Sequence, residues 1–273
     1  MPVDIDAAVM ANTRLSDDYN VLALAAPALA AGARPGQFVM IKPSRSTDPL
    51  LRRPFSIFQV LRDAGVASGF SILNKRVGTG TGLLYDVEPG ARLACLGPLG
   101  RPFEPPDTSS EAWMVAGGVG LAPFLTLAEA LAARGTKTTL FYGARRESEL
   151  YFVDEFERLG VTTVLTTEDG SRGIRGLVTG PLDTALRHRR DPEPLSLYVC
   201  GPTPMMRAVA RLADAHRRPC TVSLEQVMGC GLGGCYSCVV LTRDPGRPPH
   251  FVRSCLEGPV FDAGRIVWDA LAH

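Results

Sequence analysis

"AGGVGLAP", residues 116–123, is a glycine-rich turn that follows an apolar run and precedes an amphipathic segment. A strand, such a turn and a helix in succession are the context in which a G-x-G-x-x-G pattern binds a dinucleotide, although Pro123 stands where the third glycine would be. Gly118 and Gly120 would let the backbone close on a pyrophosphate at the helix N-terminus. A proline in the first helical turn loses no hydrogen bond. Taken alone, the segment is also compatible with an ordinary strand–helix turn.

Around this turn, short apolar runs alternate with segments of helical length and pattern from residue 112 onward. This alternation is typical of βαβ units and predicts a parallel sheet of five strands with helices on both faces. The expected strands are 112–118, 136–143, 161–168, 195–201 and 220–225, and the expected helices are 122–135, 147–160, 180–190 and 203–218. A sheet of this kind makes a nucleotide-binding domain the expected role.

The end of the fourth expected strand reads "CGPTPMM", residues 200–206. Ligands of open α/β sheets bind beyond the carboxyl ends of the strands, so Gly201 and Pro202 would form a stiff shelf for a flat ring. A turn followed by a core methionine pair is the alternative. Arg145 and Arg146 follow the second expected strand, where a ribose 2′-phosphate would lie, which favours NADP.

The first 105 residues have a different rhythm, with Gly and Pro separating short β segments and no long helical period between them. This pattern predicts an antiparallel barrel or sandwich. The expected β segments are 19–27, 36–43, 53–61, 69–77 and 91–100. Residues 101–111, "RPFEPPDTSSE", are rich in proline and polar residues and predict a linker.

Two strings in this barrel hold residue types that a flavin needs. An arginine for a phosphate, an aromatic ring for stacking and a hydroxyl for a ring nitrogen occur together in "RPFS". "KRVGTGTGLL", residues 75–84, has glycines and a threonine able to wrap a second phosphate. Each string alone is more often an exposed arginine, a core phenylalanine and a turn. The candidate residues are Arg53, Pro54, Phe55 and Ser56 in the first string and Gly78, Gly80 and Thr81 in the second.

"CGLGGCYSC", residues 230–238, has the spacing C-x4-C-x2-C, and Cys255 follows farther along the chain. Zinc sites usually pair their ligands in two C-x2-C units, whereas this order is the plant-type [2Fe–2S] arrangement. The glycines of the loop can take positive φ and let backbone amides approach inorganic sulfides. A zinc site completed by His250, a disulfide knot and a bare turn are the alternatives. "SLEQ", residues 223–226, fits a capping box and predicts a short helical turn before the loop.

The composition limits the class of protein. With 273 residues the chain is long enough for about two domains, and 45% apolar residues are ordinary for a globular protein. A net charge of +1 does not favour nucleic acid or an anionic membrane as a partner. The longest apolar run, residues 21–31, is too short to span a bilayer. We see no signal peptide and expect a cytoplasmic protein, in which Cys95, Cys200 and Cys220 are buried small hydrophobic residues rather than disulfide partners.

The motifs occur in a familiar order. R-P-F-S, G-T-G-T, G-G-V-G-L-A-P and C-G-P-T-P-M together resemble the ferredoxin–NADP reductase superfamily. The C-terminal cysteine string narrows the resemblance to the electron-transfer subunits of NAD-linked, two-component dihydroorotate dehydrogenases, to which "YGAR" at 142–145 and "GPVF" at 258–261 are also similar. The resemblance covers roughly residues 10–265 and implies an FAD-binding β-barrel (1–105), an NAD(P)-binding α/β domain (106–220) and a [2Fe–2S] domain (221–273).

The resemblance also implies residue roles. Arg53 would bind the FAD pyrophosphate, Phe55 would pack near the isoalloxazine, and Ser56 would lie by its reactive nitrogen. Gly80 and Thr81 would hold the diphosphate. Gly118 and Gly120 would face the nicotinamide dinucleotide, with Gly201 and Pro202 beside the nicotinamide. The four cluster ligands would be Cys230, Cys235, Cys238 and Cys255.

The implied partner is an FMN-containing catalytic subunit that oxidises dihydroorotate to orotate, in a heterotetramer with two copies of each chain. Electrons would run from that FMN through the cluster and FAD to NAD⁺. Related subunits serve bifurcating transhydrogenases, sulfite reductases and hydrogenases, which is the first alternative. A zinc-binding regulatory protein is the second. We expect NAD rather than NADP because "YGAR" is similar to the NAD-using subunits.

Overall fold

The computed structural model describes residues 1–105, 111–189 and 194–271. Its contacts group the chain into two compact units. The barrel unit comprises Met1–Pro102, Gln226–Val239 and Arg253–Pro259, and the sheet unit comprises Phe103–Glu225, Val240–Val252 and Val260–His273. The division into three domains at residues 105 and 220 stays a prediction. No helix in the described ranges combines the length and the apolar character that crossing a membrane requires.

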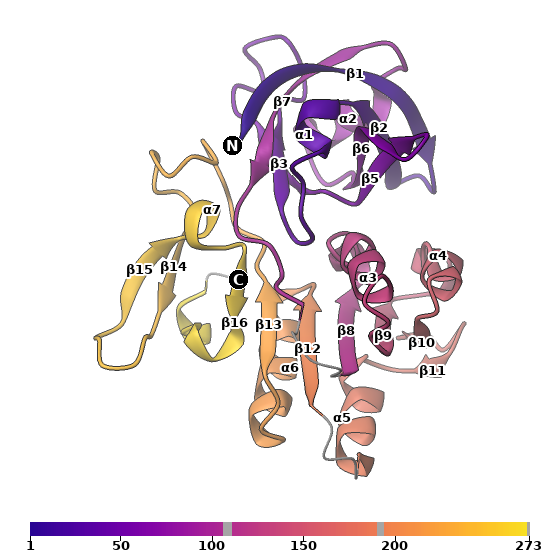
Figure 1. Cartoon of the computed structure of the whole chain (residues 1–273), viewed down its shortest axis with the longest axis vertical. Helices are drawn as coiled ribbons and strands as arrows, with labels where there is room; N and C mark the ends of the chain where they lie inside the picture. Colours follow the sequence, from indigo (N-terminus) through magenta and orange to yellow (C-terminus); the bar gives the residue numbers. More distant parts are fainter. Residues whose placement is uncertain (106–110, 190–193, 272–273) are drawn as a thin grey trace. The chain divides into compact units, whose positions relative to one another are not determined.

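The barrel unit is built on seven antiparallel strands in the order β4-β3-β7-β1-β2-β6-β5. Figure 1 labels these strands, β4 excepted. These are β1 (Val3–Arg14), β2 (Tyr19–Ala25), β3 (Phe38–Ile41), β4 (Arg53–Ser56), β5 (Gln59–Asp63), β6 (Val66–Lys75) and β7 (Arg92–Leu99). β4 and β5 form the two edges although only Ile57 and Phe58 separate them in the chain. Ile57 N–H donates to Gln37 O, and Phe58 N–H donates to Ser71 O. The sheet therefore curls until its edges meet, which confirms the predicted antiparallel barrel.

Side-chain alternation explains the barrel interior. In β7, for example, Leu93, Cys95, Gly97 and Leu99 are buried while the alternate residues are more exposed. β1 was not predicted from the sequence, because its first residues alternate acidic and apolar side chains and its inward residues include the small Ala7. β1 pairs with β2 on one side and with β7 on the other.

The unit also contains two short helices that were not predicted from the sequence, α1 (Pro27–Ala30) and α2 (Thr79–Asp86). α2 begins inside the glycine-rich string 75–84, where glycine disfavours helix. Tertiary contacts compensate: Asn20 Nδ2 donates to Leu84 O over 3.2 Å, and Asn74 Nδ2 donates to Thr81 O over 3.0 Å. The buried amides of the barrel thus hold a helix that local propensity does not predict.

The sheet unit contains a second sheet of seven strands, in the order β11-β10-β9-β8-β12-β13-β16. Every neighbouring pair is parallel except β13 and β16, which are antiparallel. The strands are β8 (Glu111–Gly117), β9 (Thr138–Ala144), β10 (Thr162–Thr167), β11 (Ile174–Arg175), β12 (Leu195–Cys200), β13 (Cys220–Ser223) and β16 (Val260–Asp262). The five predicted strands are all present. β16 comes from the "GPVF" string, which the sequence analysis had not assigned to the sheet.

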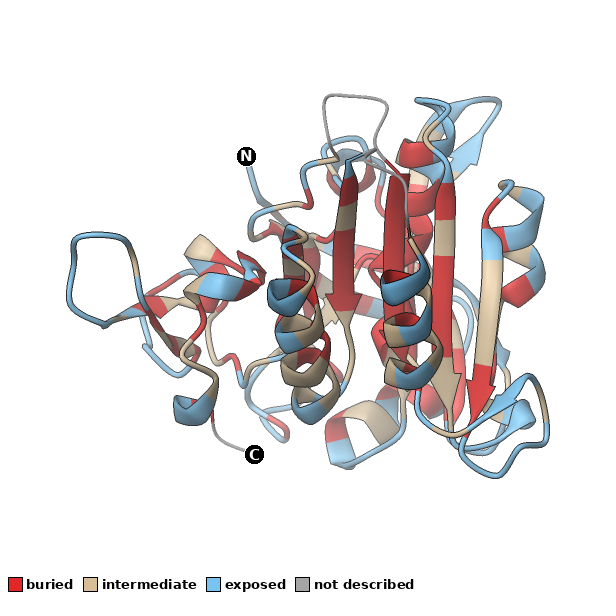
Figure 2. Cartoon of the chain, turned by 90° about the horizontal axis from the view of Figure 1, so that it is seen from below, coloured by how far each residue is buried: buried red, intermediate tan, exposed pale blue. Residues whose placement is uncertain are grey.

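Helices cover both faces of this sheet. They are α3 (Phe124–Ala132), α4 (Val153–Arg158), α5 (Thr179–His188) and α6 (Thr203–Ala215). Trp113 and Val115 of β8 share a core with α5 and α6, so the alternate Met114 faces the other side. Figure 2 shows the central strands buried along most of their length. A strand that is buried on both faces reads as an almost continuous apolar run, as β8 does.

Three local predictions differ from the structure. The helix expected at 147–160 is a short 3₁₀ turn (Glu147–Glu149) and α4, separated by residues 150–152, of which Phe152 is in the left-handed region at φ +61°. The capping box at 223–226 does not form, because Ser223 is the last residue of β13 and pairs with Val260, and residues 224–228 are not helical. The linker prediction at 101–111 fails at Phe103, which is buried against Phe124 and Tyr198; its residues 106–110 lie outside the described ranges.

The remaining elements are β14 (Val239–Thr242), β15 (His250–Arg253) and α7 (Ser254–Glu257). β14 and β15 pair with each other as a two-stranded sheet. Cys95 and Cys220 are buried as predicted, and Cys200 is half-buried. Burial raises the pKa of each of these three thiols to about 12, so they remain protonated at neutral pH.

Candidate cofactor sites

The flavin candidates lie on β4, an edge strand that pairs with β3. Arg53 is opposite Ile41 and Phe55 is opposite Val39, and Phe55 packs against the barrel core. The Arg53 guanidinium donates to Leu51 O over 2.8 Å, and its side chain is half-buried. A Cβ added to Gly80 would lie 3.2 Å from Arg53 Nε. The fold therefore brings "RPFS" and the glycine-rich string together, as both flavin assignments require.

The glycine-rich string itself forms the N-terminus of α2. Thr81 Oγ1 accepts hydrogen bonds from Val77 N–H (2.9 Å) and Gly78 N–H (3.0 Å), and it donates to Gly78 O (3.0 Å). A hydroxyl can donate one hydrogen bond and accept two, so that of Thr81 is fully used within the turn. Thr81 shapes the turn here, and the groups left for an anion are backbone N–H groups of the first helical turn.

The two glycine turns of the sheet unit meet at the carboxyl ends of β8 and β12. These strands are adjacent and parallel, with Ala116 opposite Cys200. A Cβ on Gly120 would lie 2.3 Å from Cys200 O, and one on Gly201 would lie 3.0 Å from Gly117 N. Close packing between the two turns is therefore enough to require glycine at positions 120 and 201, whether or not a ligand binds there. The turn that carries Gly118 and Gly120 thus packs against the turn that carries Gly201 and Pro202, across a sequence separation that no local pattern spans.

Gly118 differs from its neighbours. Its φ is +54°, and no heavy atom of the described residues lies within 4 Å of the position that a Cβ would take. Gly117, which sequence reasoning missed, is restricted by contact instead: a Cβ there would lie 2.7 Å from Met205 Sδ and 2.9 Å from Pro202 Cδ. Gly118 is therefore the residue of this turn whose backbone faces open space.

Arg145 and Arg146 are exposed and directly follow β9. The Arg146 guanidinium forms an ion pair with Glu149 at 3.2 Å. Asp169 N–H donates to Arg145 O, and hydrogen bonds from Ser171 lower the pKa of the Asp169 carboxyl group. An ionised carboxylate therefore belongs to the loop that contacts the backbone of Arg145, which weakens the argument for a 2′-phosphate.

Cys230 and Cys235 form one pair in the cysteine loop. Cys230 N–H donates to Cys235 Sγ over 3.4 Å, and Leu232 N–H donates to Cys230 Sγ over 3.3 Å. Ser237 Oγ lies 3.2 Å from Cys235 Sγ and accepts a hydrogen bond from Gly229 N–H. Hydrogen bonds from Ser237, and then from Cys230, lower the pKa of Cys235 to about 6. This exposed thiol is therefore largely a thiolate at neutral pH, the form that binds metal.

Cys238 and Cys255 form the second pair. Both are buried, in a small core with Phe38, Met40 and Leu99 of the barrel. Burial, and then the hydrogen bond and charge of Cys238, raise the pKa of Cys255 to about 12. A thiol in this position ionises only when a positive charge such as iron is next to it.

The cysteines fit a binuclear cluster better than a single ion. They lie in two pairs, Cys230 with Cys235 and Cys238 with Cys255. A zinc site needs four ligands around one point, whereas a [2Fe–2S] cluster takes two thiolates on each of two irons. Both ring nitrogens of His250 already have oxygen partners, Asp244 and Pro248 O. The zinc alternative therefore has no support in this geometry.

The surroundings of the cysteines point the same way. Gly231 (φ +72°) and Gly233 (φ +81°) take the left-handed conformation that lets amides turn toward sulfur. A Cβ on Gly229 would lie 3.1 Å from Cys235 Sγ. The Ser254 hydroxyl, between Arg253 and Cys255, is fully buried and has no hydrogen-bond partner among the described residues. An unpaired donor beside a cluster ligand is consistent with an acceptor such as a sulfide.

Arg253 ties the cysteine loop to the segment that carries Cys255. Its guanidinium donates to Gly233 O over 2.8 Å and to the Tyr236 hydroxyl over 3.3 Å, and it lies over the Tyr236 ring at 4.8 Å. The sequence analysis missed Arg253, Ser237 and Ser254, since no spacing rule marks a residue that acts by supporting a loop.

The cysteine loop lies against the same strand that pairs with the flavin strand. A Cβ on Gly231 would lie 2.6 Å from Met40 Cγ and 3.2 Å from Leu99 Cδ1. Met40 of β3 is in turn opposite Pro54 of β4. Opposite residues of an antiparallel pair have Cα atoms about 5 Å apart. Only β3 thus separates the cysteine loop from the flavin candidates within the barrel unit.

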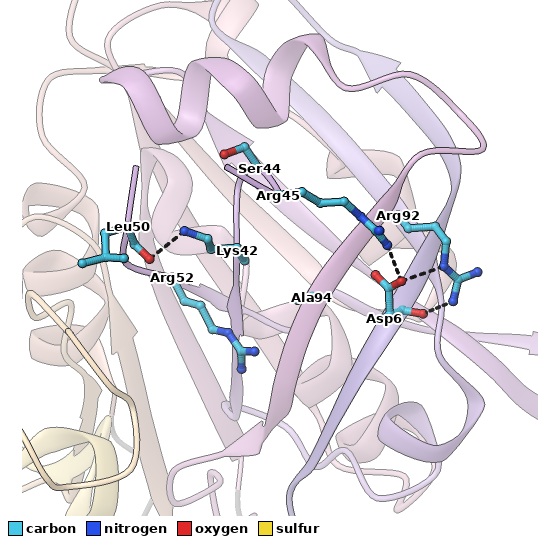
Figure 3. A pocket seen from close by; sticks show the side chains of 8 residues that line it. All are labelled: Asp6, Lys42, Ser44, Arg45, Leu50, Arg52, Arg92 and Ala94. Carbon is cyan, nitrogen blue, oxygen red and sulfur yellow. Dashed lines mark hydrogen bonds and ion pairs between the residues drawn. The ribbon is translucent and has the colours of Figure 1, made fainter. Parts of the chain in front are cut away.

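A separate basic hollow of about 610 Å³ lies on the barrel unit and is shown in Figure 3. Lys42, which lines it, donates to Pro49 O (2.5 Å) and Leu50 O (2.7 Å), and Asp6 accepts from both Arg45 and Arg92. Arg52 lines it, whereas Arg53 and the other flavin candidates do not. Its lining residues are Asp6, Lys42, Ser44, Arg45, Leu50, Arg52, Arg92 and Ala94.

Two family models match the chain. "Oxidoreductase NAD-binding domain" matches residues 114–211, and "Iron-sulfur cluster binding domain of dihydroorotate dehydrogenase B" matches residues 225–267. A protein of Desulforamulus reducens is 37% identical over 264 residues, covering 97% of this chain and 98% of its own length. One of Bacillus caldolyticus is 39% identical over 236 residues, covering 86% and 87%. Both are named electron transfer subunits of dihydroorotate dehydrogenase B (NAD(+)).

Solved structures show the same fold. A chain of the NADH-dependent reduced ferredoxin–NADP oxidoreductase, described in connection with flavin-based electron bifurcation, has a TM-score of 0.84 and 29% identity, covering 97% of this chain and 91% of its own. The ferredoxin reductase of carbazole 1,9a-dioxygenase has a TM-score of 0.67 at 24% identity, covering 80% and 67%. The second likeness concerns the fold alone.

Proposed function

The chain belongs to the family of electron transfer subunits of dihydroorotate dehydrogenase B (NAD(+)), and from this premise we propose that it carries electrons between a catalytic partner and NAD. In pyrimidine biosynthesis the partner would oxidise dihydroorotate to orotate. The single observation that carries the proposal is the position of the cysteine loop: it packs on β3, the strand that pairs with the flavin strand β4. A one-electron site and a flavin site are thus neighbours in one compact unit.

FAD would connect two-electron transfer to one-electron transfer, because a flavin exchanges a hydride with nicotinamide and single electrons with a [2Fe–2S] cluster. The chain's own residues would bind and orient these groups. We propose Arg53 as the cation for the FAD diphosphate, Pro54 and Phe55 as the packing surface of its ring, and Ser56 as a hydroxyl near the ring nitrogens. At the N-terminus of α2, Gly78 and Gly80 would let phosphate oxygens approach the chain, Thr81 would shape the turn, and backbone N–H groups of the first helical turn would hold the oxygens.

The nicotinamide dinucleotide would bind at the carboxyl ends of β8 and β12. Gly118, whose backbone faces open space, is the proposed contact for the pyrophosphate, and Gly201 and Pro202 form the shelf for the nicotinamide. Gly120 contributes by letting the two turns meet. The relatives' names specify NAD, which agrees with the carboxylate of Asp169 in the loop beside Arg145 and Arg146.

The four proposed cluster ligands are Cys230, Cys235, Cys238 and Cys255. The thiolate-favouring environment of Cys235 and the buried environment of Cys255 define two sides of the site, one exposed and one against the barrel. Electrons would therefore enter from a partner on the exposed side and leave toward the flavin strand on the buried side.

The partner would be an FMN-containing catalytic subunit, assembled as two copies of each chain. Large apolar side chains are exposed around the cysteine loop, which supports docking of a protein there. Tyr236 is 62% and Val227 81% exposed, and Leu232 and Leu256 are exposed as well. A cytoplasmic location belongs to the same proposal.

A second candidate is a subunit of a bifurcating NADH-dependent ferredoxin–NADP oxidoreductase. The TM-score of 0.84 to such a chain supports it. We place it second because sequence identity is 29% to that chain and 37% to the dihydroorotate dehydrogenase subunit of Desulforamulus reducens, over similar lengths.

The test is to co-express the chain with an FMN-containing dihydroorotate dehydrogenase subunit and to measure dihydroorotate-dependent reduction of NAD⁺. We expect the complex to be active, while the chain alone reduces artificial dyes with NADH and leaves dihydroorotate unchanged. Oxidation of dihydroorotate by the chain alone would disprove the division of labour. Reduction of ferredoxin with NADPH, in place of the expected activity, would favour the second candidate.

A further inference from the structure

The Ser254 hydroxyl is an anomaly in the barrel unit. The residue is 0% exposed, and its Oγ has no hydrogen-bond partner among the described residues. Leaving a buried hydroxyl unpaired costs free energy, so such groups are rare unless a ligand or water completes their hydrogen bonding. The backbone of the same residue is fully engaged: Ser254 N–H donates to Cys238 O, and Ser254 O accepts from Gly258 N–H.

The position of this hydroxyl limits which atoms could accept its hydrogen bond. Ser254 begins α7 and is followed directly by Cys255, while its N–H holds the backbone of Cys238 at 2.9 Å. It is therefore linked to both members of the buried cysteine pair. The small core around that pair is formed by apolar side chains, namely Phe38, Met40, Leu99, Met228 and partly Leu96. Among these side chains only the thioether sulfurs of Met40 and Met228 can accept a hydrogen bond, and they are weak acceptors, whereas the negatively charged sulfur of a cluster is a stronger one.

We propose that the Ser254 hydroxyl donates a hydrogen bond to the sulfur of the [2Fe–2S] cluster on its buried side, and that it raises the reduction potential of that cluster. The inference rests on the proposed function, since it requires the cluster. Reduction adds negative charge to the sulfurs, so a donor stabilises the reduced cluster more than the oxidised one. Ser254 acts through the cluster and not on substrate, which makes it a positioning and tuning residue.

Ser237 provides a contrast within the same loop. Its hydroxyl already has protein partners, Gly229 N–H and Cys235 Sγ, so its place is defined without the cluster. Each cysteine pair thus has one serine beside it. The Ser237 hydroxyl, at the exposed pair, has hydrogen-bond partners in the loop, whereas the Ser254 hydroxyl, at the buried pair, has none among the described residues.

The experiment is a redox titration of the purified complex, monitored by electron paramagnetic resonance, for the wild type and the Ser254→Ala variant. We expect Ser254→Ala to keep wild-type iron and sulfide content and to hold the added electron about tenfold less tightly, a fall of ~59 mV for a one-electron couple. The FAD potential should not change. Thr242→Val is the matched control, because the Thr242 hydroxyl is equally buried but donates to His250 O.

Ser254→Thr, which keeps the hydroxyl, should restore the wild-type potential. If Ser254→Ala and Ser254→Gly fail to retain iron while Ser254→Thr retains it, the hydroxyl is required by the cluster and the proposal stands. A full cluster with an unchanged potential in Ser254→Ala would overturn it, as would loss of iron from all three variants, which would indicate packing alone. Absence of iron and sulfide from the wild type would instead disprove the proposed function.

Discussion

The two glycine-rich turns of this chain, 230–238 and 116–123, look alike in sequence and use glycine for different reasons. In the cysteine loop, Gly231 combines a φ of +72° with a contact that would put a Cβ 2.6 Å from Met40 Cγ. In the other turn the two demands fall on different residues. Gly118 has the positive φ and faces open space, whereas Gly120 has ordinary φ and would place a Cβ 2.3 Å from Cys200 O.

This difference separates a loop that is held against a surface from a turn that is open to a ligand. The cysteine loop needs glycine so that its backbone can follow the barrel and turn amides toward sulfur. The turn at 116–123 needs Gly120 so that it can pack against the turn after β12. Gly118 leaves another backbone segment of the same turn without a side chain. Composition alone does not distinguish these cases, but substitutions do.

The largest effect should follow Cys235→Ser, which tests the chemistry of the loop. A serine oxygen is a poorer iron ligand than a thiolate, so the cluster should be lost and electron transfer to the partner should stop. Reduction of dyes by NADH should persist, because that path uses only the flavin and the dinucleotide. Stopped-flow mixing with NADH in the presence of the partner measures both. Cys220→Ala is the control and should keep its iron; a serine variant that relays electrons without iron would contradict the mechanism.

Gly120→Ala should have the next largest effect, because a backbone carbonyl cannot move away from the new methyl group. We expect the free energy of unfolding of the sheet unit to fall by about 3 kcal/mol, at the upper end for overpacking. Urea unfolding followed by tryptophan fluorescence reports on this unit, since Trp113 and Trp268 both belong to it. Gly180→Ala is the matched control: it lies in α5 with open space around it, and it should be neutral or slightly stabilising.

Gly231→Ala tests the corresponding demand in the cysteine loop. The left-handed φ and the contact with Met40 should together destabilise the loop by about 2 kcal/mol, since Met40 is a side chain that can adjust. The measurable result is a lower ratio of iron to protein. Gly234→Ala, four positions before Cys238 and free of contacts within 4 Å, should bind iron like the wild type. Equal iron loss in both variants would mean that the loop requires glycine throughout.

The smallest effect on stability should come from Gly118→Ala. Its strain arises from φ alone and is worth about 1 kcal/mol. If the dinucleotide binds where we propose, the methyl group should also raise KM for NADH. Gly135→Ala carries the same strain, with φ +68° and open space, in the same unit but after α3. Gly135→Ala should lower the free energy of unfolding by a similar amount and leave the KM for NADH unchanged. If both variants changed this KM alike, the proposal that the dinucleotide binds at the turn of Gly118 would be wrong.

Much of the local structure could be predicted because local patterns decide it. Short β segments separated by Gly and Pro predicted the barrel strands, and alternating strands and helices predicted the parallel sheet. The failures have physical causes: α2 forms against glycine propensity because Asn20 and Asn74 hold its backbone, and the capping box at 223–226 yields to the pairing of Ser223 with β16. In both cases a partner that is distant in sequence outweighs the local preference.

The sequence by itself determined the kinds of chemistry that the chain can hold, because cysteine spacing, the order of the motifs and the glycine turns are written in consecutive residues. Only the tertiary structure decided where these parts meet. It placed the cysteine loop on β3 beside the flavin strand, joined the turns after β8 and β12, and left the Ser254 hydroxyl without a partner next to Cys255. Such contacts depend on strand order and close packing across the whole chain, and a short stretch of sequence contains neither.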